Sequence, residues 1–164
     1  MDCRNAVEQK IAPGADAALE VCKAWRSKGE KMVFTNGCFD LFHAGHAHSL
    51  LEAARLGNRL VVGLNDDSSV KALKGNDRPF VSWEQRALIL AALTPVDLVV
   101  PFSGNSPEPL IRLLQPDVLV KGADYAIEAI AGAEFVKACG GQVVCIPLLS
   151  GFSGTILVEK IRHG

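Results

Sequence analysis

The sequence predicts a single α/β domain in which five parallel strands form a doubly wound sheet with helices on both faces. Short apolar runs alternate along the 164 residues with longer segments whose apolar residues recur at helical spacing. This alternation favours a parallel sheet, because parallel strands need a long crossover connection. The strand runs are almost entirely apolar, as expected when helices cover both faces. The length predicts one domain over residues 1–164.

Six helices are expected from amphipathic spacing and from residues that begin or end helices. Asp16 can cap the first helix and Gly29 ends it. Ser82 and Gln85 have capping-box spacing at the start of another helix, and a proline opens the next one. In chain order, the predicted helices cover residues 16–28, 44–56, 82–93, 107–114, 127–139 and 155 onward.

Five strands are expected where apolar runs are bounded by turn residues. The first run starts at residue 31 and breaks at Asn36-Gly37. Residues 1–14 are polar and contain Pro13-Gly14, so we expect an irregular N-terminal segment. The four later strands are predicted at residues 60–64, 96–100, 117–121 and 142–147.

Polar residues follow the second strand, beginning with Asn65 and Asp66. Because the carboxyl ends of parallel strands meet at one edge of a sheet, we expect these residues to face the same cleft as Asn36 and His43. Asp66 equally suits a structural role, as the cap of a short helix that carries Val70. The sequence leaves both roles open.

Residues 71–80 form a polar segment that contains three cations and several helix-breaking residues. We expect a mobile loop over the cleft. Lys74 and Arg78 on this loop could neutralise an anionic ligand. The alternative is a solvated basic loop without a ligand.

Residues 31–46 are the most informative stretch. In it, the predicted first strand is followed by two histidines that are one helical turn apart. If a helix begins beside them, His43 and His46 project from one side of its first turn, where unpaired backbone N–H groups favour anions. Gly37 would permit a tight turn, and Gly45 would leave room for phosphate groups. A histidine pair at this spacing is usually a surface feature, but its place at a strand-to-helix junction favours phosphate chemistry.

This stretch resembles the Gly-x-Phe-Asp-x-x-His-x-Gly-His signature of the cytidylyltransferase-like nucleotidyltransferases, which implies a Rossmann-like fold of the HxGH type. Aminoacyl-tRNA synthetases of the first class carry a similar His-x-Gly-His. A chain this short lacks room for their tRNA-binding parts, and no Lys-Met-Ser-Lys-Ser-like segment occurs. Neither a P-loop nor a G-x-G-x-x-G motif is present. The resemblance implies catalytic roles for His43 and His46, and nucleotide-binding roles for Thr35, Asn36, Gly37, Cys38, Phe39, Asp40 and Gly45.

Later segments are similar to the adenylyltransferase half of bacterial ADP-heptose synthases, namely residues 73–79, 84–86, 120–125 and 151–155. This resemblance implies transfer of AMP from ATP to D-glycero-D-manno-heptose 1-phosphate. The products would be ADP-heptose, for lipopolysaccharide core or surface glycan, and pyrophosphate. That half is often fused to a sugar kinase, so we expect a separate heptose kinase and phosphatase in the pathway.

The same resemblance extends the candidate site. Lys74 is expected to act with the histidines, and Asn65, Asp66 and Arg78 to contact the substrate. Gly154 departs from the family's usual Ser-Thr-Thr and removes one hydroxyl group. Glu84 and Arg86 are more consistent with ion pairs between elements than with chemistry. Further nucleotide contacts are implied at Lys121, Gly122, Asp124, Tyr125, Ser153 and Thr155, although a lysine capping a strand end remains the alternative for Lys121.

Composition limits the class of partner. A formal net charge of −1 gives no basic surface for nucleic acid. Five cysteines without metal-site spacing indicate reduced thiols in the cytoplasm, with Cys38 in a packing role. No apolar stretch approaches a membrane span, so no membrane partner is expected. We expect a homo-oligomer, specifically a dimer, and Mg²⁺ bound with ATP, because no cluster of ligands for a permanent metal is visible.

Two other functions remain open at this point. A glycerol-3-phosphate or related alcohol-phosphate cytidylyltransferase would share the first signature. A nucleotide-binding regulatory protein would keep the fold without catalysis, although the presence of His43, Gly45, His46 and Lys74 argues against it.

Overall fold

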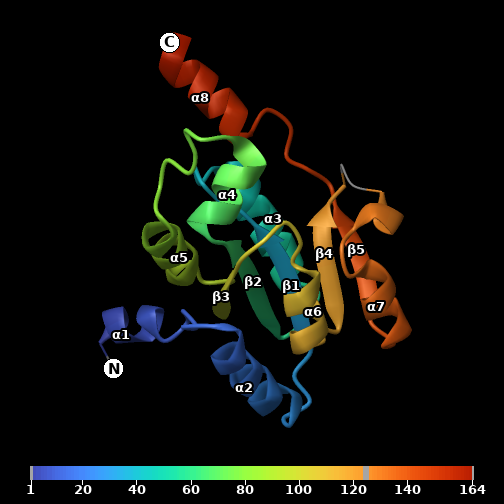
Figure 1. Ribbon diagram of the computed structural model, residues 1–164. Helices are drawn as coiled ribbons and strands as arrows, with labels where there is room; N and C mark the ends of the chain where they lie inside the picture. The colour runs from blue at the N-terminus through green and yellow to red at the C-terminus, as the bar shows by residue number, and fades with distance from the viewer. Residues whose placement is uncertain (1, 124–125, 164) are drawn as a thin grey trace.

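Five parallel strands form the sheet of this computed structural model, which describes residues 2–123 and 126–163. Neighbouring strands lie in the order β3-β2-β1-β4-β5 (Figure 1). Every pairing is parallel, so the predicted doubly wound α/β fold is confirmed. In chain order, the strands are β1 Met32–Gly37, β2 Arg59–Asn65, β3 Leu98–Phe102, β4 Val118–Gly122 and β5 Gln142–Ile146.

Helices cover both faces of the sheet. α2, α6 and α7 pack on one face, and α3 and α5 on the other. α8 extends beyond the carboxyl ends of the strands, away from both layers (Figure 1). None of the described helices has the length and apolar content needed to cross a bilayer. The helices are α1 Cys3–Glu8, α2 Ala15–Arg26, α3 Ala44–Ala54, α4 Asp67–Lys74, α5 Trp83–Ala92, α6 Glu108–Leu114, the 3₁₀ turn η1 Ile127–Ala129, α7 Ala133–Ala138 and α8 Gly154–His163.

Alternate residues of each strand enter two separate cores. In β1, Met32 and Phe34 join the core beneath α2, α6 and α7, whereas Val33 joins the core beneath α3 and α5. All three side chains are at most 1% exposed. Full burial of a side chain of this kind stabilises the fold by about 1.5–3 kcal/mol. The apolar strands therefore hold the sheet between two helical layers, as their composition predicts.

The central strand β1 separates from β4 towards the carboxyl edge. β1 pairs with β2 along its whole length, whereas its pairing with β4 ends at Phe34 and Leu119. The strand order also reverses here, since the chain winds outwards from β1 to β3 and then returns to the other side of β1. Such a reversal opens a crevice at the carboxyl ends of the strands.

The N-terminal segment is not irregular, contrary to the sequence-based expectation. It contains α1, whose cap Asp2 accepts a hydrogen bond from Arg4 N–H at 3.3 Å. Beyond α1, Ile11 bridges Val99 of β3, and Ala12 N–H donates to the Val99 carbonyl at 2.9 Å. These residues cover the outer edge of β3. The apolar pair at 11 and 12 is too short to be recognised as part of a sheet by periodicity.

Two other element predictions are wrong. The expected loop over residues 71–80 starts later, because α4 continues through Lys74. The expected helix over residues 127–139 is divided into η1 and α7. Gly132 lies between them with a φ of +83°, and a Cβ at this position would lie 2.9 Å from Cδ1 of Ile111. Tertiary packing against α6 therefore overrides the helical periodicity.

Replacing Gly63 with alanine is expected to destabilise the fold by about 1–3 kcal/mol, because small-to-large changes in a packed core force side chains to move. A Cβ at Gly63 would lie 2.7 Å from Cζ of Phe34. Urea unfolding measures the loss. Phe34→Leu shortens the contacting side chain, so the double variant should lose less stability than the sum of the two single losses. Strictly additive losses would contradict this contact.

Candidate active site

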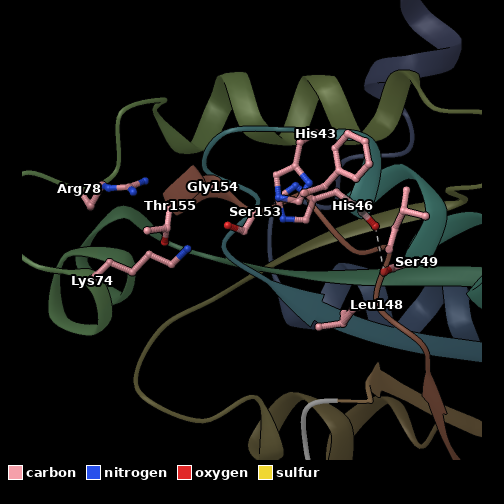
Figure 2. Close-up of a pocket in the computed structure, with 12 residues that line it drawn as sticks. His43, His46, Ser49, Lys74, Arg78, Leu148, Ser153, Gly154 and Thr155 are labelled. Atoms are coloured by element: carbon pink, nitrogen blue, oxygen red, sulfur yellow. Dashed lines mark hydrogen bonds between the residues drawn. The ribbon is translucent and has the colours of Figure 1, made fainter. Parts of the chain in front are cut away.

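Two adjoining pockets open at the carboxyl edge of the sheet. The histidine pocket, of about 510 Å³, lies where α3, α4 and the start of α8 meet (Figure 2). The strand-end pocket, of about 550 Å³, is lined by the ends of β1, β2 and β4. The two pockets share His46, Ser49, Lys74 and Leu148. The other residues of the histidine pocket are His43, Gly45, Arg78, Leu149, Phe152, Ser153, Gly154 and Thr155.

The histidine pair belongs to the start of α3, as predicted. His43 is the N-cap residue and His46 lies in the first turn. Their rings stack, with centroids 3.7 Å apart and planes at 23°. A Cβ at Gly45 would lie 3.0 Å from the His43 ring and 3.3 Å from Cβ of Phe152. Gly45 therefore leaves room for the His43 imidazole, and because it also lines the histidine pocket, room for phosphate stays a prediction.

Both histidines favour the neutral form in the protein without ligand. Burial is the largest cause that lowers the pKa of His46, to about 4, and the charges of His43 and Lys74 lower it further. Burial and the charge of Lys74 also lower the pKa of His43. In the empty site, the two rings are therefore not permanent cations near neutral pH. The Nδ1 atoms of both rings are buried without a hydrogen-bond partner among the described residues. A bound anion would give a protonated ring nitrogen an acceptor.

The start of α8 supplies a second group of donors to the histidine pocket. Ser153 Oγ accepts a hydrogen bond from Ile156 N–H at 3.1 Å and so caps the helix. Lys74 and Arg78 extend towards the residues at the start of α8 (Figure 2). The positive end of a helix dipole and two cations on one side of a pocket favour an anionic ligand.

Asp40 anchors the segment that carries Arg78. Its carboxylate is 2% exposed and forms an ion pair of 2.5 Å with Arg78. The same carboxylate accepts hydrogen bonds from the backbone N–H groups of Phe80, at 2.7 Å, and Val81, at 3.1 Å. Arg78 is thus a fixed residue of the pocket instead of part of a solvated loop. The geometry gives Asp40 a structural role, and its expected nucleotide contact stays a prediction.

Asp66 has the structural role that the sequence had left open. It caps α4, where its Oδ1 accepts from Ser69 N–H at 2.7 Å, and its Oδ2 accepts from Ser103 Oγ at 2.5 Å. Burial alone would raise the pKa of Asp66, but the hydrogen bonds from Ser103, Ser69 and Ser68 outweigh it and lower the pKa to about 2. Asp66 lines neither pocket. Its lone pairs are used within the protein, so a substrate contact is not supported.

The strand-end pocket gathers most of the expected nucleotide contacts. Asn36 and Lys121 face each other across the crevice, where Lys121 Nζ donates to the Asn36 carbonyl at 3.3 Å. Asn65 is 4% exposed, and its Oδ1 lies 3.9 Å from Sγ of Cys38. Burial raises the pKa of the Cys38 thiol, in agreement with a packing role. Asp124 and Tyr125 lie outside the described residues. The remaining expected residues that line this pocket are Thr35, Gly37, Phe39 and Gly122.

Several residues of the pockets were missed by sequence reasoning. Ser49 lies one helical turn after His46, so α3 places both on one side. Leu148, Leu149 and Phe152 line the histidine pocket from the connection that leads to α8. That connection has no regular element, so only the fold places it beside α3.

The described residues contain no group of three or more histidine, cysteine or acidic side chains that could hold a metal ion. The carboxylates of Asp40 and Asp66 are also engaged in hydrogen bonds within the protein. The described part of the site therefore offers no cluster of free ligands for a metal held by the protein alone.

The model of the cytidylyltransferase-like family matches residues 34–145, from β1 to β5. The match covers the histidine pair and the strand ends that form the crevice. This chain belongs to the cytidylyltransferase-like family. The nucleotidyltransferase class expected from the first signature is thereby confirmed.

Curated relatives match nearly the whole chain. The bifunctional protein HldE of Magnetococcus marinus is 50% identical over 152 residues, which cover 93% of this chain and 31% of that protein. HldE of Hydrogenovibrio crunogenus is 56% identical over 138 residues, which cover 84% of this chain and 29% of that protein. The chain spans about a third of the length of these relatives.

Two solved structures are similar. The lipopolysaccharide core biosynthesis protein from Thermoplasma volcanium has 26% identity and a TM-score of 0.58, covering 74% of this chain and 98% of that one. Pantoate-beta-alanine ligase from Francisella tularensis, complexed with beta-gamma ATP and beta-alanine, has 16% identity and a TM-score of 0.65, covering 93% of this chain and 76% of that one. The second likeness shows the fold alone.

The neutral state of His46 should make stability depend on pH. The folded pKa of about 4 lies below the ordinary value of 6.5, so the unfolded chain binds more protons between these values. The contribution of neutral His46 to the free energy of unfolding is complete above about pH 6.5 and is lost as pH falls towards 4. We expect the free energy of unfolding to fall by an amount on the order of 1–3 kcal/mol. Urea unfolding at pH 7 and 4.5 measures it, and His46→Gln should reduce the difference; an unchanged difference would contradict a buried neutral imidazole.

Proposed function

We propose that this chain transfers AMP from ATP to D-glycero-D-manno-heptose 1-phosphate, giving ADP-heptose and pyrophosphate. The observation that carries the proposal is the histidine pocket, where a stacked histidine pair, two cations and the start of α8 converge beside the strand-end pocket. Such a site can hold two phosphate-bearing ligands side by side. Alignment of two anions is the main requirement of this reaction.

The identity of the acceptor is supported by similarity. Relatives of about 50% identity carry the name HldE, and the Thermoplasma volcanium protein is described as acting in lipopolysaccharide core biosynthesis. The segments at 73–79, 84–86, 120–125 and 151–155 resemble the adenylyltransferase half of ADP-heptose synthases. The reported relatives give no support to an alcohol-phosphate cytidylyltransferase or to a regulatory protein without catalysis.

The reaction needs no strong base. An oxygen of the ionised sugar phosphate attacks the α-phosphorus of ATP, and the bond from that phosphorus to the β-phosphate oxygen breaks. Pyrophosphate leaves with the electron pair of this bond. His43 and His46 would donate hydrogen bonds to phosphate oxygens, and Lys74 and Arg78 would offset the charge that develops. Mg²⁺ would enter with ATP as part of the substrate.

The pathway context is also part of the proposal. A heptose kinase must supply the sugar 1-phosphate. The five free cysteines are consistent with a reducing cytoplasm. A homodimer remains a prediction.

A pyrophosphate-release screen tests the proposed function. Four nucleoside triphosphates are paired with heptose 1-phosphate, glycerol 3-phosphate and mannose 1-phosphate, and product is identified by mass. ATP with heptose 1-phosphate should give the highest kcat/KM. Preference for CTP with glycerol 3-phosphate would replace this proposal with the cytidylyltransferase alternative, and the absence of turnover with every pair would favour the regulatory one.

Removal of either imidazole should slow the reaction. We expect His46→Ala and His43→Ala to lower kcat by roughly 10²- to 10³-fold, the range for one preorganised donor to a developing oxyanion. His48→Ala is the matched control, because His48 lies on the same helix and lines neither pocket. Turnover near the wild-type rate in both pocket variants would remove the histidines from the mechanism.

Restoring a hydroxyl at the start of α8 should strengthen ATP binding. A Cβ at Gly154 meets no atom within 4 Å, so the first carbon of a side chain is accommodated without repacking. We expect Gly154→Thr to lower KM for ATP by about tenfold, the value of one hydrogen bond to a charged group. Gly154→Val has the same shape without the hydroxyl and should not give this gain. An equal effect of both substitutions would assign the change to helix stability.

A further inference from the structure

Arg86 is a charged side chain in the interior of the protein, with 0% exposure. Its Nη1 donates to the Cys38 carbonyl at 2.6 Å, and its Nε donates to the Val81 carbonyl at 2.9 Å. Its Nη2 forms an ion pair of 2.6 Å with Asp67. Burial of a guanidinium group costs a large desolvation free energy, which can exceed the gain from its ion pair. Burial of Arg86 is therefore not in itself evidence that it stabilises the fold. Its three partners, however, belong to three segments that border the site.

These segments are the turn after β1, the segment at residues 78–81 and the start of α4. Asp40, which follows β1, also connects the first two segments, because its carboxylate binds Arg78 and the N–H groups of Phe80 and Val81. Val81 is therefore held at both its N–H, by Asp40, and its carbonyl, by Arg86. The turn that leads into the histidine pair and the segment that carries Arg78 form one hydrogen-bonded unit.

Asp67 connects α4 to this unit. It is the first residue of α4, and Lys74 is the last. An α-helix of this length is a rigid element of about 10 Å, so its anchorage at Asp67 affects where Lys74 lies. Lys74 lines the histidine pocket together with His43 and His46, and its charge lowers the pKa of both rings.

We propose that Arg86 is a positioning residue that fixes the turn after β1, residues 78–81 and α4 relative to one another, and thereby holds Lys74 opposite the histidine pair. The inference rests on the proposed function for its kinetic consequence. Arg86 itself lines neither pocket. Its ion pair with Asp67 affects the position of Lys74. Its hydrogen bond to the Cys38 carbonyl affects the position of the histidines.

Asp67→Asn tests this role without emptying the buried site of Arg86. The Asp67 side chain is 47% exposed, so the variant should fold. We expect kcat to fall about tenfold with KM for ATP within about twofold, because a small displacement of an aligned group affects the aligned transition state most. Asp67→Glu keeps a carboxylate within reach and should recover most of the rate. Arg86→Lys, which keeps the charge but loses the planar fork, should resemble Asp67→Asn if it folds.

A double-variant cycle separates positioning from general stability. If Asp67 acts through Lys74, adding Asp67→Asn to Lys74→Ala should change kcat by less than about twofold. The matched control is Glu84→Gln, which also removes an acidic residue from the first turn of a helix. Glu84 forms no ion pair within the part of the chain that the structure describes, and its variant should keep the wild-type kcat. Multiplicative losses in the Asp67 and Lys74 double variant would overturn the inference.

A second readout does not depend on turnover. In NMR titrations, loss of the nearby ammonium group in Lys74→Ala should raise the pKa of His43 and His46. Asp67→Asn should raise these values in the same direction if Lys74 moves away. If the pKa values of His43 and His46 in Asp67→Asn equal those of the wild type, the inference is overturned, whether or not any substrate is turned over. Absence of turnover in the wild type, with the expected histidine shifts, would instead reject only the proposed function.

Discussion

The reversal of strand order beside β1 is the constraint on which the site depends. The chain winds from β1 to β3 on one side and returns to β4 and β5 on the other. No crossover helix can close the sheet at this point, so β1 and β4 separate after Phe34 and Leu119. The turn after β1 therefore lies at the centre of the crevice. Lys121 reaches across it to the Asn36 carbonyl, and α3 must begin beside it, which places the histidines there.

Charge in the site is divided between permanent cations and partly buried imidazoles. Burial and the charge of Lys74, which lines the histidine pocket, already disfavour a proton on either ring. The rings can accept a proton at low cost only when an anion supplies compensating charge. Binding of an anionic ligand and protonation of the histidines would thus be coupled. Neutral rings in the empty site avoid the repulsion that Lys74 and two charged imidazoles would create.

Sequence reasoning predicted the parts of the molecule that depend on local pattern. Uniform apolar runs predicted the five strands, and the residues between Thr35 and His46 predicted where the first strand ends and the next helix begins. The misassigned parts depend on contacts between distant residues. The break at Gly132 comes from close approach to Ile111, and the neutral histidines come from burial. Of the expected site residues, Asp40 and Asp66 are carboxylates whose partners only the folded chain brings near, so sequence could not distinguish structural from ligand-binding roles.

α8 contributes residues to the histidine pocket but has no buried residue of its own. An isolated helix of ten residues is marginal in water, so most of the free energy that holds α8 must come from contacts at its first turn. Such an element belongs to the least protected class of cooperative unit and exchanges its amide hydrogens through local opening, not through global unfolding. An anionic ligand in the pocket would then stabilise the helix, and departure of that ligand would remove this stabilisation. Part of the intrinsic affinity for such a ligand would be consumed by this ordering, which would favour rapid release over tight retention.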